Sequence, residues 1–309
     1  MHVLVTGGAG FIGSHVVDAL IEQGHEVTVV DNLSTGSAQN LNPRARFYEI
    51  SICNPQVSEV FEKEKPDVVN HQAAQVVIQR SAEDPIFDAE QNILGSLNLI
   101  LNSIRFGVKK IIYASTGGAV YGDPEYLPVD EGHPVNPISP YGISKHTVEH
   151  YIHVYSIQYE IDYVVLRYSN VYGPRQNITG ASGVVPTFAR QMLQGVQPTI
   201  FGSGDKTRDY IYIADVVSAN LLATQGNVRG IYNVGTGIET TDKEMFDTLA
   251  KMLAYKDIPH YAQVGKGEIY QTCLNNSKAI RDLGWEPRVS LREGLSQTVT
   301  YLKAHLGIV

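Results

Sequence analysis

The sequence is poor in cysteine, in positive charge and in long apolar runs, and each shortage excludes a class of protein. Its two cysteines, Cys53 and Cys273, follow no metal-ligand spacing and suggest no disulfide framework. The 24 lysines and arginines stand against 32 acidic residues, and the net charge of −8 argues against a nucleic-acid-binding protein. No apolar run is long enough to span a bilayer, which argues against a membrane protein.

The chain also has little sequence in front of its first predicted strand. Because that strand begins within the first few residues, we expect no signal peptide and a cytoplasmic location. The 309 residues are enough for one large domain, or for a large domain with a smaller lobe. No internal repeat and no low-complexity linker divides them further.

What the sequence does contain is a glycine-rich loop near its start. The apolar run 3–5 predicts a buried strand, and a helical pattern of apolar residues begins at Phe11. Gly7 permits a tight turn at this junction, Gly10 lets a pyrophosphate approach the backbone, and Gly13 lets the helix pack closely on the strand. Strand, loop and helix in this order are the context that a dinucleotide fingerprint requires.

An acidic residue at the end of the second predicted strand supports this interpretation. The strand covers residues 26–30, and Asp31 follows 18 residues after Gly13, near the spacing expected of a ribose-binding carboxylate. Such a carboxylate accepts hydrogen bonds from the 2′-hydroxyl of NAD and repels the 2′-phosphate of NADP. No lysine or arginine follows within ten residues, so we predict NAD. The alternative is that Asp31 only caps the strand.

The first part of the chain alternates strands with helices. Further strands are predicted at residues 46–50, 67–70, 110–114 and 163–167, and long helices at residues 85–106 and 141–159. This alternation predicts an α/β fold, a Rossmann-type doubly wound parallel sheet with right-handed crossovers. Ligands of such sheets bind at the carboxyl ends of the strands.

Composition changes after Arg167, because glycine, proline and polar residues become frequent between residues 170 and 183. We therefore divide the chain into an NAD-binding domain, residues 1–169, and a mainly substrate-binding lobe, residues 170–309, that is smaller and interleaved with it. The lobe is predicted to contain helices at 185–194, from 214, at 242–253, 277–283 and 291–306, strands at 199–201 and 231–234, and a charged loop before residue 214.

Tyr141 and Lys145 form the candidate catalytic pair. They lie four residues apart at a predicted helix start and so share one face of that helix. A tyrosine titrates near ~10, so a phenolate at neutral pH needs a pKa shift of ~3 units, which a lysine and a positively charged nicotinamide ring can supply together. Such a tyrosine can take the proton of a sugar hydroxyl, with Thr116 binding the same hydroxyl. The alternative is an ordinary surface pair, since the chain has 18 tyrosines.

Taken in order, these motifs resemble the extended short-chain dehydrogenase/reductase family, and within it the nucleotide-sugar epimerases. The resemblance covers nearly the whole chain. The matching segments are TGGAGFIGSH (6–15), DNLSTG (31–36), HQAA (71–74), STGGAVYG (115–122), SPYGISK (139–145), RYSNVYGPRQ (167–176), RDYIYIADV (208–216), YNVGTG (232–237) and LGW (283–285). The resemblance implies an isomerase that uses NAD to invert C4 of a nucleotide-linked hexose, UDP-glucose or UDP-galactose above all, through a transient 4-keto sugar.

The resemblance also implies a role for each matching residue. Thr116, Tyr141 and Lys145 would be catalytic, and no metal would be bound. The cofactor would contact Gly7, Gly10, Phe11, Ile12, Gly13, Asp31, Asn32, Ser34, Gly36, Ser51, Ile52, Ala73, Ala74, Gln75, Asn92, Tyr141, Lys145 and Ser169. The substrate would contact Thr116, Asn170, Val184, Val185, Phe201, Arg208 and Thr272, with Asn170 and Arg208 on its diphosphate.

Some of these residues have a structural alternative. His71 fits a structural residue at a strand end better than a catalyst or a metal ligand. The amide of Asn92 can be satisfied within its helix, and Arg208 can form a surface pair with Asp209.

Three positions depart from the family pattern. Ser51 stands where the family often has an aspartate beside the adenine, Gly265 where it usually has an arginine, and Asn275 where it has an aspartate. These differences leave the fold unchanged and bear on which nucleotide sugar is bound.

Other functions on the same scaffold remain open. They include an epimerase of a UDP-N-acetylhexosamine or a UDP-uronate, and a dehydratase or decarboxylase. Dehydratases place an Asp-Glu pair after the catalytic threonine, whereas Gly117 and Gly118 follow Thr116 here. A non-catalytic NAD-binding protein is the alternative from another class.

The resemblance carries two further expectations. The long predicted helices have apolar residues beyond one face, and in the family such helices pair across a two-fold axis, which implies a homodimer. Thr272 is small where a bulky aromatic residue narrows the sugar site of some epimerases, so we expect some activity on UDP-N-acetylhexosamines.

Overall fold

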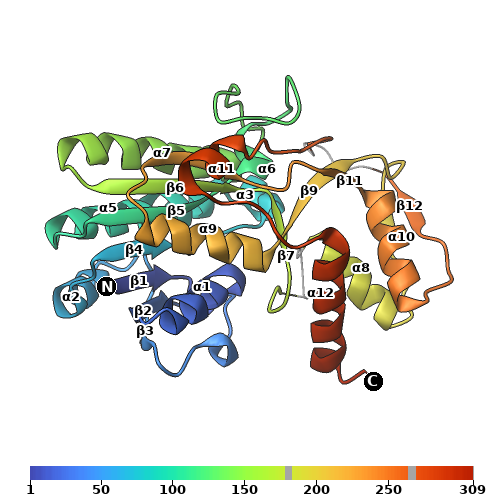
Figure 1. Ribbon diagram of the computed structural model, residues 1–309, viewed down its shortest axis with the longest axis horizontal. Helices are drawn as coiled ribbons and strands as arrows, with labels where there is room; N and C mark the ends of the chain where they lie inside the picture. Colours follow the sequence, from blue (N-terminus) through green and yellow to red (C-terminus); the bar gives the residue numbers. More distant parts are fainter. Residues whose placement is uncertain (178–182, 264–268, 309) are drawn as a thin grey trace.

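The computed structural model describes residues 1–177, 183–263 and 269–308. A seven-stranded sheet forms the larger part of the molecule, and a smaller part lies beside it (Figure 1). The order of the sheet is β10-β6-β5-β4-β1-β2-β3, and every neighbouring pair is parallel. Its strands are β1 (His2–Thr6), β2 (Glu26–Asp31), β3 (Arg46–Glu49), β4 (Val68–His71), β5 (Lys110–Thr116), β6 (Asp162–Tyr168) and β10 (Gly230–Val234). The order reverses between β1 and β4, where doubly wound sheets bind their ligands.

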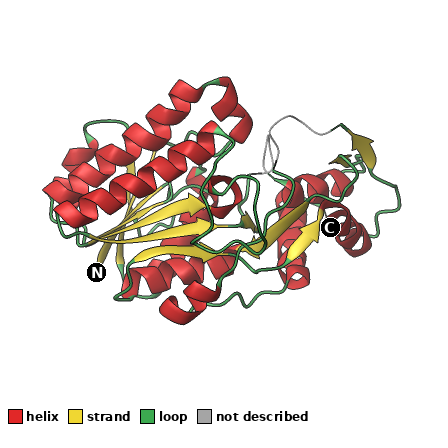
Figure 2. Ribbon diagram, turned by 90° about the horizontal axis from the view of Figure 1, so that it is seen from above, coloured by secondary structure: helices red, strands yellow, loops and turns green. Residues whose placement is uncertain are grey.

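Helices cover both faces of this sheet (Figure 2). One face carries α1 (Phe11–Glu22), α9 (Ile213–Gln225) and α11 (Ser277–Leu283), and the other carries α2 (Val57–Glu64), α5 (Gly95–Arg105) and α7 (Pro140–Gln158). Central strands buried on both faces are apolar throughout. In β1, Val3 and Val5 join the core under α1 and α9, whereas Leu4 joins the core under α2, α5 and α7.

Short helical turns connect these elements. They are the 3₁₀ turn η1 (Ala38–Asn40), α3 (Ile78–Glu83), α4 (Pro85–Ala89), the π-helical turn η2 (Glu90–Leu94) and α6 (Gly117–Val120). The single helix predicted over residues 85–106 is therefore three segments, α4, η2 and α5. A π-helical turn inside an α-helix is often found at a functional site.

The smaller part has its own core. Strands β7 (Asn170–Tyr172), β9 (Thr207–Tyr212) and β11 (Glu239–Thr241) form one sheet, and β8 (Thr199–Phe201) pairs with β12 (His260–Ala262). The helices α8 (Val184–Leu193), α10 (Asp242–Leu253) and α12 (Leu291–Leu306) pack together. A capping box, in which Thr241 and Glu244 bond each other's backbone N–H groups, begins α10.

The expected Rossmann-type α/β fold is confirmed, but the charged loop predicted before residue 214 is wrong, because this segment contains β9. Asp209 can be buried within this strand because its carboxylate accepts hydrogen bonds from the N–H groups of Thr236, Gly237 and Leu274. The chain crosses back after residue 170, because β10 pairs with β6. The division into two domains stays a prediction. In the described residues every helix is too short or too polar to cross a membrane.

Candidate active site

The glycine-rich loop lies at the carboxyl end of β1 and is packed backbone to backbone. Gly7 has a φ of +68°, a conformation that side chains rarely adopt. A Cβ atom at Gly7 would lie 2.8 Å from the backbone nitrogen of Ala73, and one at Gly13 would lie 2.1 Å from the carbonyl oxygen of Gly7. Both distances are too short for a side chain. Glycine at these two positions therefore allows the N-terminus of α1 and the loop after β4 to pack against this loop.

The N-terminus of α1 fits an anion. Its N-cap residue is Gly10, no side chain caps it, and the first turn contains no acidic residue. The first N–H groups of a helix have no partner inside the helix, and together with the helix dipole they attract a phosphate. The backbone at Gly10, Phe11 and Ile12 therefore suits the pyrophosphate of NAD, and the contact itself stays a prediction.

Asp31 ties the end of β2 to the same loop. Its buried carboxylate accepts the N–H of Ala9 at 3.0 Å through Oδ2 and the N–H of Leu33 at 2.8 Å through Oδ1. A carboxylate has about four acceptor positions, so two bonds leave capacity for ribose hydroxyls. The segment predicted to border the adenosine folds back here, since a Cβ at Gly36 would lie 2.9 Å from the carbonyl carbon of Ala9.

The other predicted cofactor residues follow the carboxyl ends of the neighbouring strands. Residues 32 and 34 follow β2, residues 51 and 52 follow β3, residues 73–75 follow β4, and residue 169 follows β6. Asn92, in the π-helical turn, bonds both backbone groups of Gln75, accepting its N–H at 2.9 Å and donating to its carbonyl oxygen at 2.9 Å. Asn92 therefore holds the loop after β4, and its contact with the cofactor stays a prediction.

His71 is a neutral structural residue. Its Nδ1 is 2.7 Å from the hydroxyl of Thr6, and its Nε2 is 2.9 Å from the hydroxyl of Ser96. Burial, with a smaller contribution from the charge of Lys145, lowers the pKa of His71 to about 3.

The structure brings the three predicted catalytic residues together. Thr116 ends β5, Tyr141 lies in the first turn of α7, and the hydroxyl of Thr116 is near enough to the phenol to lower its pKa. The hydroxyl of Ser139 caps α7 by accepting the N–H of Gly142 at 3.1 Å. One turn further, the ammonium of Lys145 donates to the carbonyl oxygen of Ala114 at 2.7 Å.

Burial sets the protonation of the Tyr141–Lys145 pair. It raises the pKa of Tyr141, the charge of Asp88 raises it further, and the hydrogen bond with Thr116 opposes the shift. Burial lowers the pKa of Lys145 to about 8, against the opposing effects of Asp88 and Glu149. The sequence predicted that Lys145 and the nicotinamide ring together lower the pKa of Tyr141. In the protein alone this pKa is raised, and Thr116, not Lys145, is the group that opposes the rise.

Two of the predicted substrate residues lie near these side chains. A Cβ added at Gly118 would lie 3.8 Å from the hydroxyl oxygen of Thr116 and 3.7 Å from the amide oxygen of Asn170, so both residues flank one backbone position. Asn170 is paired with Tyr210 of β9, two residues along the strand from Arg208.

Arg208 is held by backbone oxygens. Its guanidinium donates to the carbonyl oxygens of Thr207 at 2.7 Å, Ile269 at 2.7 Å and Tyr270 at 3.1 Å. The alternative of a pair with Asp209 is wrong, because the carboxylate of Asp209 bonds other groups. A guanidinium has five N–H donors, so this arrangement orients Arg208 and leaves donors for a phosphate.

Two more predicted residues, Ser169 and Thr272, carry buried hydroxyls. The hydroxyl oxygens of Ser169 and Thr272 are buried and have no hydrogen-bond partner among the described residues. A buried hydroxyl without a partner is costly, and a ligand can supply the missing bond. Both positions therefore fit a contact with a bound ligand.

For the remaining predicted substrate residues the role stays a prediction. Val185 packs in the core of the smaller part, Val184 is partly buried beside it, and Phe201 on β8 is 47% exposed. Of the departures from the family pattern, Ser51 accepts the N–H of Cys53 at 3.2 Å and Asn275 accepts that of Ser277 at 2.9 Å. Gly265 lies outside the described residues.

Sequence reasoning missed the buried carboxylates around the catalytic pair. Glu149 accepts the hydroxyl of Ser115 at 2.5 Å and two nitrogens of Arg167, the closer at 2.5 Å. Its position, four residues after Lys145 on the same helix, was a signal that could have found it. Asp88 lies in the long helix predicted over residues 85–106, observed as the short helix α4, and gives no such signal.

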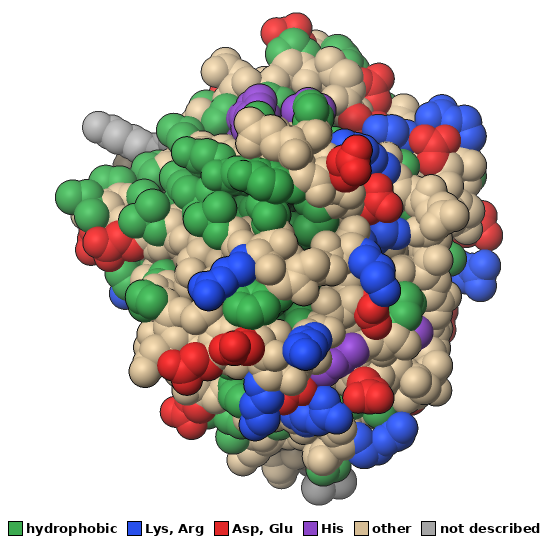
Figure 3. All heavy atoms as spheres, turned by 90° about the vertical axis from the view of Figure 1, so that its left-hand side faces the viewer, with side chains coloured by type: hydrophobic (Ala, Val, Ile, Leu, Met, Phe, Trp, Pro, Cys, Tyr) green, Lys and Arg blue, Asp and Glu red, His purple; other side chains and the backbone are tan. Residues whose placement is uncertain are grey.

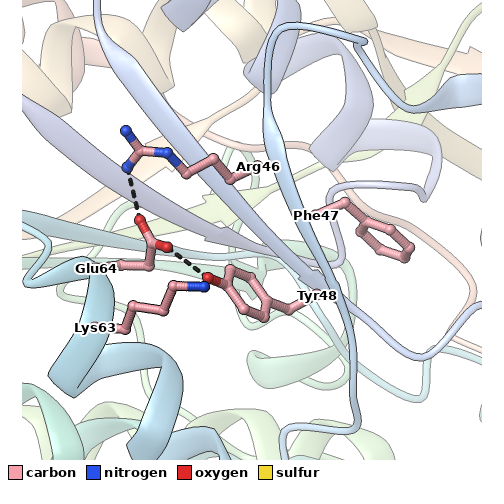
Figure 4. A pocket seen from close by; sticks show the side chains of 5 residues that line it. All are labelled: Arg46, Phe47, Tyr48, Lys63 and Glu64. Atoms are coloured by element: carbon pink, nitrogen blue, oxygen red, sulfur yellow. Dashed lines mark hydrogen bonds and ion pairs between the residues drawn. The ribbon is translucent and has the colours of Figure 1, made fainter.

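A cavity of about 550 Å³ lies elsewhere, at the start of β3 (Figure 4). Its residues bond one another: Glu64 accepts the hydroxyl of Tyr48 at 2.5 Å and the guanidinium of Arg46 at 2.7 Å. This cavity is at the amino end of the strand, opposite the edge where such sheets bind ligands. We therefore place the active site at the glycine-rich loop and Tyr141.

Fold and site together define a dinucleotide-binding protein with a threonine–tyrosine–lysine centre. The model of the NAD dependent epimerase/dehydratase family matches residues 3–235, and the chain belongs to this family. The predicted family, Rossmann-type fold and use of NAD are thereby confirmed.

Relatives with names and structures match the chain over nearly its whole length. A protein of Methanocaldococcus jannaschii described as a putative UDP-glucose 4-epimerase is 45% identical, over 97% of this chain and 98% of its own length. The structure of a UDP-glucose 4-epimerase from Thermotoga maritima with UDP-glucose has a TM-score of 0.98 and 48% identity, covering 99% of this chain and 100% of that one. The Thermus thermophilus UDP-glucose 4-epimerase complex with NAD has a TM-score of 0.93 and 41% identity, covering 98% and 99%.

Proposed function

We propose that the protein is an NAD-dependent epimerase that interconverts UDP-glucose and UDP-galactose by inverting C4 of the hexose. One observation carries the proposal: Thr116, Tyr141 and Lys145 come together at the strand edge that also holds the glycine-rich loop, with the Lys145 ammonium bonded to the backbone of β5. The full-length similarity to UDP-glucose 4-epimerases supports the choice of substrate.

Each residue of the site has a task in this reaction. The bound NAD supplies the group that removes and returns the hydrogen on C4. Tyr141 takes the proton of the C4 hydroxyl and gives it back, and Thr116 orients that hydroxyl. Lys145 keeps positive charge next to the phenol, which favours the phenolate. Asn170 and Arg208 hold the diphosphate while the sugar turns.

The structure disfavours the dehydratase alternative. A dehydratase needs an acid–base pair at positions 117 and 118, but a Cβ at Gly117 would lie 2.5 Å from the side chain of Leu274. An aspartate does not fit there unless the buried side chain of Leu274 moves. The glycine therefore suits an enzyme that needs no second acid–base pair.

The test is product analysis with a panel of nucleotide sugars. We expect UDP-glucose and UDP-galactose to be interconverted, and no product from either that has lost water or a carbon. A 4-keto-6-deoxy sugar would identify a dehydratase. An inert panel, with NAD bound, would support the non-catalytic alternative.

We also propose that two copies of the chain pair through α5 and α7. An apolar patch lies on the side of the molecule that these helices occupy (Figure 3). The exposed apolar side chains of these helices include Leu101 of α5, 50% exposed, and Val154 and Ile157 of α7, 45% and 63% exposed. Monomeric proteins rarely expose such patches, whereas pairing of like helices buries them.

Light scattering on variants tests the pairing. Ile157→Asp should give a monomer at micromolar concentration, because it places a charge in the apolar contact. Ile258→Asp is the matched control, since Ile258 is 76% exposed on the smaller part and should leave the dimer intact. A monomeric wild type would contradict the proposal. The cytoplasmic location and a role in galactose metabolism stay predictions.

A further inference from the structure

Asp88 joins three segments behind the catalytic pair. It lies in α4 and is 1% exposed. Its carboxylate accepts hydrogen bonds from the amide of Gln75 at 2.8 Å, the amide of Asn92 at 3.0 Å and the hydroxyl of Ser144 at 2.8 Å. These donors belong to the loop after β4, to the π-helical turn and to the start of α7. One buried side chain therefore connects the loop predicted to line the cofactor with the helix that carries Tyr141.

These hydrogen bonds do not explain why a charged aspartate, and not a neutral residue, occupies position 88. Its three donors are neutral groups, and no ion pair of Asp88 occurs among the described residues. Burying a carboxylate without a cationic partner is costly, whereas an asparagine has nearly the same shape and carries no charge. We therefore ask which neighbouring group the negative charge of Asp88 stabilises.

The negative charge of Asp88 stabilises the protonated form of Lys145. It is buried, and Asp88 and Glu149 are the two groups that oppose the effect of burial on its pKa. From β4, His71 faces Lys145 as a neutral imidazole. From β5, the ring of Tyr113 lies 4.7 Å from the ammonium nitrogen.

The other charges around Lys145 are already balanced. The carboxylate of Glu149 is paired with Arg167 at 2.5 Å, so much of its field is cancelled. Tyr141, the remaining titratable neighbour, is kept neutral by burial, which raises its pKa. Asp88 is therefore the carboxylate near Lys145 whose charge no arginine cancels.

We propose that Asp88 is a positioning residue: through its hydrogen bonds to Gln75 and Ser144 it holds the turn of α7 that carries Tyr141 and Lys145 against the loop after β4, and its negative charge acts on the Lys145 ammonium. It acts through Lys145 and through its three hydrogen-bond donors. The inference rests on the proposed function, in which Lys145 acts as a cation beside Tyr141.

The first test is the pH profile of the epimerase reaction for D88N. Asp88 raises the pKa of both Lys145 and Tyr141, so its removal lowers both, and both limbs of the profile should move to lower pH. We expect D88N to lose about tenfold in kcat relative to wild type at about pH 8.5, and less than about threefold at about pH 6.5. A profile that coincides with that of the wild type would overturn the proposal.

S144A is the matched control. It removes one hydrogen bond to Asp88 and keeps the charge. We expect a lower kcat with the limbs of the profile unmoved. An equal shift to lower pH in S144A and D88N would mean that packing, and not charge, sets the profile.

A second test needs neither NAD nor substrate. We measure the free energy of unfolding for the cofactor-free wild type, D88N, K145M and the double variant. The double-mutant cycle should show a favourable coupling between Asp88 and Lys145 at about pH 7 that vanishes at about pH 10, where Lys145 is neutral. A coupling that does not change with pH would contradict the charge role.

The tests separate the possible failures. If D88N does not fold, D88N/K145M should fold, because no cation then needs the carboxylate, and failure of both variants would make the role of Asp88 purely structural. If the wild type has no epimerase activity, the proposed function fails. The coupling in the cofactor-free protein then still decides whether Asp88 keeps Lys145 protonated.

Discussion

The large sheet and the smaller part hold their site residues in different ways. At the large sheet the backbone itself is the constraint, since a Cβ at Gly13 would lie 2.1 Å from the carbonyl oxygen of Gly7. In the smaller part, side chains do the holding: Arg208 reaches the carbonyl oxygens of Ile269 and Tyr270. A backbone cradle accepts almost no substitution, whereas a site built from side chains can change its ligand by single substitutions. We infer that the sheet carries the chemistry and the smaller part the substrate choice.

Replacing Tyr141 should have the largest effect, because it removes the acid–base group at the sheet. Tyr141→Phe keeps the ring and is expected to lose at least ~100-fold in kcat, the usual scale for such a group. NAD should still bind, as calorimetry on stripped protein can show. A variant with near-normal turnover would move the acid–base role to another residue.

A methyl group at Gly13 tests the backbone cradle. Gly13→Ala should weaken NAD binding about tenfold or more, because the loop or α1 has to move to admit the methyl. Gly118→Ala is the matched control for NAD binding, since its Cβ would make only contacts of 3.7 Å and longer. Calorimetry with NAD measures both. If Gly13→Ala binds NAD as tightly as the wild type does, close backbone packing does not constrain the site at the large sheet, and the contrast with the smaller part fails.

The site residues at the large sheet were easier to predict from the sequence than those of the smaller part. Gly13 and Asp31 were predictable, because the backbone groups that they contact, at Gly7 and Ala9, lie in the same glycine-rich loop and the spacing is set by that unit. The close contact of Gly7 with Ala73, which follows β4, was not predictable in this way. The strand around Arg208 was missed, because the carbonyl oxygens that accept hydrogen bonds from its guanidinium, at residues 269 and 270, lie some sixty positions away. Asp88 was missed for the same reason, since Gln75 and Ser144 meet it only through the fold.

Arg208 in the smaller part should affect binding more than turnover. Arg208→Ala is expected to raise KM for UDP-glucose about tenfold, the scale of a lost charged hydrogen bond, with kcat within about threefold. Arg208→Lys should recover only part of the loss, because an ammonium cannot match two phosphate oxygens at once. Steady-state kinetics with unchanged NAD affinity checks this. A fall in kcat alone would place Arg208 in the chemistry.

Thr272 should give the smallest effect, a change in sugar preference. Its buried hydroxyl has no partner among the described residues, and its side chain is small. We expect measurable activity on UDP-N-acetylhexosamines. Thr272→Tyr should abolish that activity and leave kcat/KM for UDP-glucose within about threefold, because only the N-acetyl group needs the space. A wild type active on UDP-glucose and inert on the N-acetyl sugars would refute this expectation.

The most direct test of an epimerase that keeps its cofactor is the reaction without added NAD. The purified protein is incubated with UDP-galactose, and UDP-glucose and the absorbance of reduced nicotinamide are followed together. We predict conversion towards the equilibrium mixture of the two sugars with no sustained rise in reduced nicotinamide, because the hydrogen taken from C4 returns to it. Reduced nicotinamide formed in proportion to an oxidised sugar, only when NAD is supplied, would show a dehydrogenase and contradict the account.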